Sequence, residues 1–172
     1  GSKSTAIVYQ ALTTQNFSSA TDSRNTAVGY NAGLSITTAT SNVLVGSLCG
    51  DALTVGNSNV AVGDIALTQD TQGDRNVAIG FNSLADQNFT SSTDSYNTAV
   101  GYNSGAAITT GTNNTIVGGL AGDAMTTGSA NTAIGINAMG GAITTGTSNT
   151  AVGNSAGFDL TSGSNNLLLG ND

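Results

Sequence analysis

The stretch Asn25-Thr-Ala-Val-Gly29 decides the fold, because the chain repeats its pattern from one end to the other. An Asn, three small or β-branched residues and a Gly return at a short and nearly constant spacing, after a degenerate first copy at Ser4-Thr-Ala-Ile-Val8. From Ser4 onward, the differences between successive start positions are 21, 17, 17, 17, 21, 17, 17, 18 and 17. The Asn residues that open the copies are Asn25, Asn42, Asn59, Asn76, Asn97, Asn114, Asn131, Asn149 and Asn166.

Ten copies occupy nearly all of the 172 residues, so we expect one repeat domain over residues 4–172. We interpret residues 1–3 as the remnant of a tag or linker. A longer period lies above the first: positions 15–63 match positions 87–135 at an offset of 72, and about two thirds of them are identical. The 72-residue blocks begin near residues 4, 76 and 149.

The composition of each repeat predicts strands. Gly, Thr, Asn and Val are poor helix formers, and short apolar segments followed by Gly, Asn and Ser are typical of strands and turns. Short strands at a near-constant period predict an all-β fold, a parallel β-solenoid of about ten coils. Coils stack at roughly 4.8 Å, so nine intervals give a rod about 43 Å long.

Each predicted strand is apolar on both faces. Its first and third residues point one way and its second residue the other. Two further apolar columns follow, seven and eleven positions after each Asn. The small column is Ala11, Ala32, Cys49, Ala66, Ser83, Ser104, Ala121, Ala138 and Ala156, and the larger one is Ile36, Leu53, Ile108, Met125 and Leu160, with Ile143 displaced by one position.

We expect both columns and the first and third strand positions to fill the coil, which leaves the second position outside. An exposed apolar ladder of that length is rare on soluble monomers. We therefore expect copies of the same chain to cover it, giving a homo-oligomer. The alternative is that the second position, mostly Ala, tolerates solvent.

The composition also excludes several functions. Three basic residues against ten Asp, with a net charge of −7, are too few for a nucleic-acid interface. Without His or Glu, nothing in the sequence would activate a nucleophile, so we expect no enzyme, no cofactor and no metal. No apolar run approaches the roughly 18 residues of a membrane span. The single Cys49 is read as a small core residue.

The candidate binding residues lie in the two long coils, whose extra residues form the loops 15–24 and 87–96. Insertions on one side of a solenoid often form its binding face. Phe17 and Phe89, with Asp22 and Asp94, offer a sugar-binding surface; alternatively each Phe folds back onto the coil beneath it. An aromatic column after the Gly position contains Tyr30 and Tyr102, for which packing at a subunit edge is the other reading. We interpret the Asn column as a structural ladder of amide hydrogen bonds.

Two other features suggest ligands. Asp70 and Asp74 lie in one turn with enough oxygens for Ca²⁺, although their spacing matches no calcium loop and a structural turn is favoured. Thr residues recur at one place on many coils and suggest an ice-binding face as an alternative function: Thr37-Thr38, Thr54, Thr109-Thr110, Thr126-Thr127 and Thr144-Thr145.

The segments Asn25–Gly33 and Asn97–Gly105 resemble the repeats of viral tail-fibre proteins. They are also similar to the head repeats of bacterial trimeric autotransporter adhesins, whose strand motif is matched at Val77–Gly80. The resemblance covers residues 4–170. It implies a left-handed β-roll with three chains side by side, serving as a fibre shaft or head on a virion, or at a bacterial surface or secreted. The implied partner is a cell-surface polysaccharide or a protein receptor.

Overall fold

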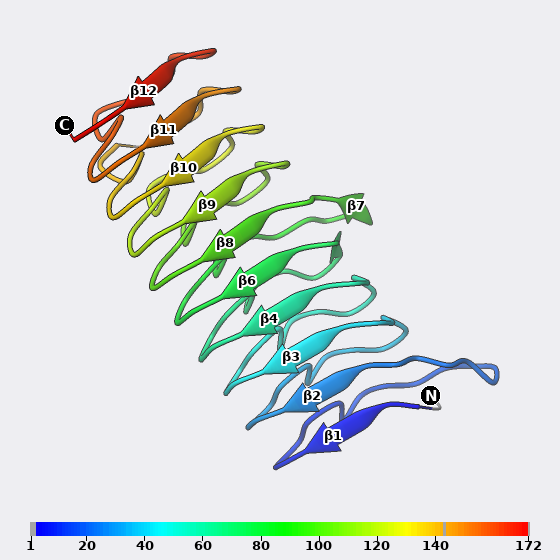
Figure 1. The fold of residues 1–172 in the computed structure, drawn as a ribbon. Coiled ribbons are helices and arrows are strands. Elements are labelled where there is room, and N and C mark those ends of the chain that lie inside the picture. Colours follow the sequence, from blue (N-terminus) through cyan, green and yellow to red (C-terminus); the bar gives the residue numbers. More distant parts are fainter. Residues whose placement is uncertain (1–2, 143, 172) are drawn as a thin grey trace.

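The computed structural model describes residues 3–142 and 144–171; Gly1 and Ser2 of the expected tag remnant and the displaced core residue Ile143 lie outside them. Within that part of the chain the protein is all-β, without a helix, and forms a coiled stack whose two ends carry the two termini (Figure 1). The strands are β1 (Thr5–Ile7), β2 (Thr26–Val28), β3 (Val43–Val45), β4 (Val60–Val62), β5 (Gly73–Asp74), β6 (Val77–Ile79), β7 (Thr93–Asp94), β8 (Thr98–Val100), β9 (Thr115–Val117), β10 (Thr132–Ile134), β11 (Thr150–Val152) and β12 (Leu167–Leu169).

Ten of these strands, one from each coil, form a single parallel sheet. Its order is β1-β2-β3-β4-β6-β8-β9-β10-β11-β12. Equivalent residues pair in register, as where Thr26, Ala27 and Val28 lie beside Val43, Leu44 and Val45. The remaining strands, β5 and β7, form their own parallel pair, and β7 lies within the second long loop. The predicted β-solenoid of about ten coils with 17-residue spacing is therefore confirmed.

The core lies inside the coils, and the second strand position faces it. Ala27, Leu44 and Ala61 are completely buried, and most of the small column and of the larger apolar column is buried with them, whereas Ala11 and Leu160 are partly buried. The expected orientation of the strand was therefore wrong. The physical reason is the ladder Asn, which is buried and stands two residues before the second strand position, so that both side chains point inward.

Left-handed backbone closes each coil tightly. The residue before each ladder Asn has a positive φ, as does Lys3 (φ 60°) before Ser4 in the first coil; the last is Asn165 (φ 62°). In the ten-stranded sheet, the Gly that follows each strand from β2 onward also has a positive φ; Gly29, for example, has φ 143°. A Cβ at Gly29 would collide with the carbonyl oxygen of Gly46 on the next coil. Gly is therefore required there both for its backbone angle and for the close approach of two coils.

Candidate functional site

The buried Asn column is a structural ladder. The backbone N–H of Asn42 donates to Oδ1 of Asn25 at 2.9 Å, and its side-chain Nδ2 donates to the carbonyl oxygen of Gly56, also at 2.9 Å. The same pattern links Asn59 to Asn42 and continues to Asn166. From Asn25 to Asn149 these side chains are at most 1% exposed. They connect one coil to the next and offer no atoms to a ligand.

The first and third strand positions form the outward side of the ten-stranded sheet, which we call the outer strand face. The third position is Val, Ile or Leu in every coil, and the first is Thr, Val or Leu, so the face carries no charge. The exposed apolar seam expected from the sequence is thus present, but on the opposite side of the strand. Its third-position residues are Ile7, Val28, Val45, Val62, Ile79, Val100, Val117, Ile134, Val152 and Leu169.

An aromatic column extends the outer strand face. Tyr9 and Tyr30 stack with ring centroids 5.7 Å apart and an interplanar angle of 7°. Phe81 and Tyr102 stack in the same way at 5.4 Å and 11°. All four rings are exposed. Among the described residues, every exposed large apolar side chain lies on the outer strand face or in the two residues after a strand, except Tyr96.

The two long loops are anchored by glutamines that sequence reasoning missed. Gln15 and Gln87 lie eleven positions after the start of their repeats, where five other coils have Ile, Leu or Met. Oε1 of Gln15 accepts a hydrogen bond from Nδ2 of Asn25 at 3.0 Å, and Oε1 of Gln87 accepts one from Asn97 at 2.8 Å. Each long loop is therefore tied to the Asn ladder from inside the coil.

The Phe89 ring does not contribute to the suggested sugar-binding surface, because it is buried. Phe89 is only 6% exposed, and Phe17 is half-buried. The interpretation in which the Phe folds back onto the coil is thus confirmed for Phe89. The buried ring also lies close to Gly73, where an added Cβ would come within 3.0 Å of it.

The carboxylates of Asp70 and Asp74 are occupied by protein donors. Oδ1 of Asp70 accepts from the backbone N–H of Gly73 at 3.0 Å and of Phe89 at 3.3 Å, while Nε2 of Gln87 donates to Oδ2 at 2.6 Å. Burial raises the pKa of Asp70, and these hydrogen bonds oppose the rise. Asp74 is buried and accepts from Asn57 and Ser92. The geometry supports the structural turn rather than a calcium site.

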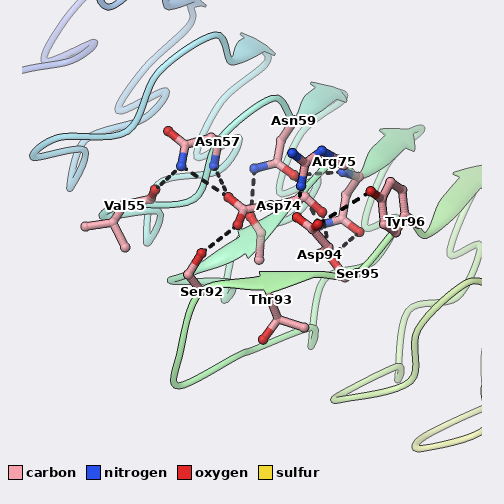
Figure 2. A network of polar contacts seen from close by, with 12 residues as sticks. Val55, Asn57, Asn59, Asp74, Arg75, Ser92, Thr93, Asp94, Ser95 and Tyr96 are labelled. Atoms are coloured by element: carbon pink, nitrogen blue, oxygen red, sulfur yellow. Dashed lines mark hydrogen bonds and ion pairs between the residues drawn. The ribbon is translucent and has the colours of Figure 1, made fainter.

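A polar cluster lies at the base of the second long loop (Figure 2). Arg75 forms an ion pair with Asp94, and its Cζ lies 5.6 Å from the centroid of the Tyr96 ring. The Tyr96 hydroxyl donates to Oδ2 of Asp94 at 3.4 Å. At the equivalent place in the first long loop, Asp22 forms ion pairs with Lys3 and with Arg24. The sequence pointed to Asp22 and Asp94, but not to these partners.

The Thr column is partly engaged in holding the coils together. The Thr37 hydroxyl donates to the carbonyl oxygen of Thr54 at 3.1 Å, and that of Thr54 donates to Thr71 at 3.0 Å. The second Thr of each pair is exposed, as at Thr38 and Thr110. The column therefore presents two exposed Thr residues at Thr37-Thr38, but one at Thr109-Thr110, Thr126-Thr127 and Thr144-Thr145.

The described part of the chain offers few side chains suited to catalysis or to metal binding. No three or more His, Cys, Asp or Glu side chains gather there as a metal site would require. Cys49 is buried, and burial raises the pKa of its thiol to about 12. The same part of the chain includes no helix that could span a membrane.

The surface features that remain are the outer strand face and the two polar clusters at the long loops. Comparison with protein-family models, with curated proteins and with solved structures finds no match to this chain. The chain is therefore described by its fold, as a parallel β-solenoid.

Proposed function

We propose that the chain is a rigid segment of a trimeric tail fibre or a tail-fibre-like adhesin, either a shaft or a head. The observation that carries the proposal is the outer strand face, which is apolar, uncharged and continuous over all ten coils. Three copies packed about a common axis would remove this face from water. The parallel strands and the Asn ladder give such an assembly its stiffness along the rod.

The size of the face is suited to a stable contact. About 43 Å of stacked coils, counting the three strand residues and the two residues after them at 3.3 Å per residue, gives roughly 700 Å². Stable interfaces bury about 800 Å² per partner. The aromatic column forms the edge of this area, where Tyr30 and Tyr102 would meet a neighbouring copy.

Charge favours the same arrangement. Each chain has a net charge of −7, so a trimer carries 3 × −7 = −21 charges. Copies approaching through Asp-bearing surfaces would repel one another, whereas the outer strand face brings no like charges together. The remaining surface would stay in water and meet a cell-surface polysaccharide or a protein receptor. The segment would thus serve host attachment from a virion, or adhesion at a bacterial surface or after secretion.

The first experiment is light scattering behind a sizing column. A monomer has a mass of 16.8 kDa, and a trimer has three times that mass. The double variant Val100→Asp and Val117→Asp puts two charges on the outer strand face and is expected to give the monomer. The matched control, Thr110→Asp with Thr127→Asp, adds the same charges to exposed Thr positions and should remain trimeric. A wild-type chain that elutes as a monomer would refute the proposal.

A second candidate function, ice binding, is favoured by one observation. Four consecutive strands place Thr98, Thr115, Thr132 and Thr150 in register on the outer strand face. Neighbouring hydroxyls then repeat at about 4.8 Å along the rod. This function needs the face free, so it requires a monomer. Thermal hysteresis measured on a monomeric chain would support it, and the absence of hysteresis would eliminate it.

A further inference from the structure

The chain places all of its positive charge at the two long loops. Its three basic residues are Lys3, Arg24 and Arg75. They lie in the left-handed position that precedes the first strand repeat and the ladder residues Asn25 and Asn76. Each is paired with the Asp of a long loop, Asp22 or Asp94. The 72-residue duplication has therefore produced two related clusters four coils apart on the rod.

The second cluster differs from the first by an aromatic ring. Tyr96 occupies the position that Arg24 has in the first loop. It is 50% exposed, and it is the one exposed large apolar side chain in the described residues that lies away from the outer strand face and its flanking column. If three copies cover the outer strand face, this ring remains in solvent. A trimer interface therefore does not explain its exposure.

We propose that Tyr96, Asp94 and Arg75 form a binding site for a neutral saccharide. This inference rests on the proposed function, because it names what the segment would bind at a cell surface. Arg75 lies over one face of the Tyr96 ring, and the half-exposed ring supplies its other face to the C–H groups of a sugar. The half-exposed Asp94 carboxylate accepts hydrogen bonds from sugar hydroxyls. Arg75 has five N–H donors, and its ion pair with Asp94 leaves others free to donate to sugar oxygens.

The backbone around these three residues is held in place before any ligand arrives. Arg75 and Tyr96 have φ values of 62° and 49°, and Asp94 lies in β7, which pairs with β5. Ser95, between Asp94 and Tyr96, is buried, and its hydroxyl donates to the carbonyl oxygen of Asp74 and is 2.9 Å from Oδ1 of Asn76. Figure 2 shows Asp94, Ser95 and Tyr96 gathered close to Asp74 and Arg75. A preformed arrangement of this kind reduces the ordering that binding would require.

Charge selects a neutral ligand over an acidic one. The single cation of the site is already paired with Asp94, and Asp74 lies buried directly behind the loop. The chain as a whole is strongly negative, with a net charge of −7. A uronic acid or sulfated sugar would therefore be repelled rather than attracted.

The test is binding of the full chain to an array of neutral hexose and N-acetylhexosamine oligosaccharides, with uronic-acid and sulfated oligosaccharides on the same array. We expect binding to neutral members. Tyr96→Ala should weaken it at least about tenfold, which corresponds to about 1.4 kcal/mol. Tyr96→Phe keeps the ring and should stay within about threefold of the wild type. Arg24→Ala, the matched change in the first loop, should leave binding unchanged.

Three results would overturn the inference: no neutral oligosaccharide binds, only acidic ones bind, or Tyr96→Ala binds as well as the wild type. A thermal melt of each variant shows whether it is folded, and Tyr96→Phe separates loss of the ring from loss of the fold. The mass measurement keeps the two proposals apart. A trimer that binds no neutral sugar refutes the site alone, whereas a monomer refutes the trimeric fibre.

Discussion

Replacing Leu44 by Ala tests which side of the strand faces the core. Leu44 is completely buried at the second position of β3. Its two terminal methyl groups lie over Gly33 and Gly50, where an added Cβ would come within 2.8 Å of them. Those glycines leave the space that the Leu side chain fills, and their backbones cannot close around a smaller one.

The expected cost is about 3–4 kcal/mol. Removing three carbon atoms at about 0.8 kcal/mol each accounts for about 2.4 kcal/mol of lost transfer free energy. The remaining cavity adds to that, within the roughly 2–5 kcal/mol measured for buried Leu→Ala changes. Ile116→Ala tests the same cost at a second site. Ile116 is also buried and lies at the equivalent position of β9 in the second 72-residue block.

Urea denaturation followed by circular dichroism measures this cost, and an unchanged m-value shows that the same transition is being compared. Thr38→Ala is the control, since Thr38 is exposed, and it should stay within about 0.5 kcal/mol of the wild type. If Leu44→Ala costs less than about 1 kcal/mol, the second strand position does not face the core and the packing argument fails.

Three other predictions concern single residues. Gly46→Ala should lower stability by more than about 2 kcal/mol in a thermal melt, because Gly46 has φ 145° and an added Cβ would collide with the carbonyl oxygen of Gly63; an unchanged melting temperature would contradict this. Burial raises the pKa of Asp70 above 3.8, so the folded state binds the proton more tightly and stability should fall as pH rises from about 4 through the folded-state pKa. Melting temperatures across pH should show that fall in the wild type and a smaller one in Asp70→Asn, and equal slopes would refute the assignment. Because the Cys49 thiol is buried and its pKa is about 12, it should react with a disulfide reagent at pH 8 only in denaturant, and rapid reaction of the native chain would contradict its burial.

The repeat length and the fold class were predictable because every repeat contains the same short sequence pattern. Asn, three strand residues and Gly recur in register, and parallel pairing of those segments follows directly from stacking. The predicted orientation of the strand was wrong, because hydrophobicity alone does not show which of two apolar faces points toward the core. The signal was present in Asn25 itself: a buried amide ladder at that position places Ala27, two residues later, on the same inner side.

The candidate site was harder to predict, since its residues meet only through stacking. Arg75 and Tyr96 are separated in the sequence by one long coil and become neighbours because they occupy the same position on adjacent coils. Gln87 looked like a loop residue, yet it is buried in the core column and bonded to Asp70. In both cases the position of the residue within its coil determines its partners.

The in-register stacking of coils of unequal length sets fixed distances along the rod. One 72-residue block contains four coils, so the bases of its long loops recur at about 19 Å along the rod. Because equivalent strand residues pair in register, duplicating a block lengthens the rod by a fixed step and repeats the loop on the same side, as Figure 1 shows for the loops before β2 and β8. The length of such a rod therefore changes by whole blocks. The distance between ligands bound at its long loops changes by the same increments.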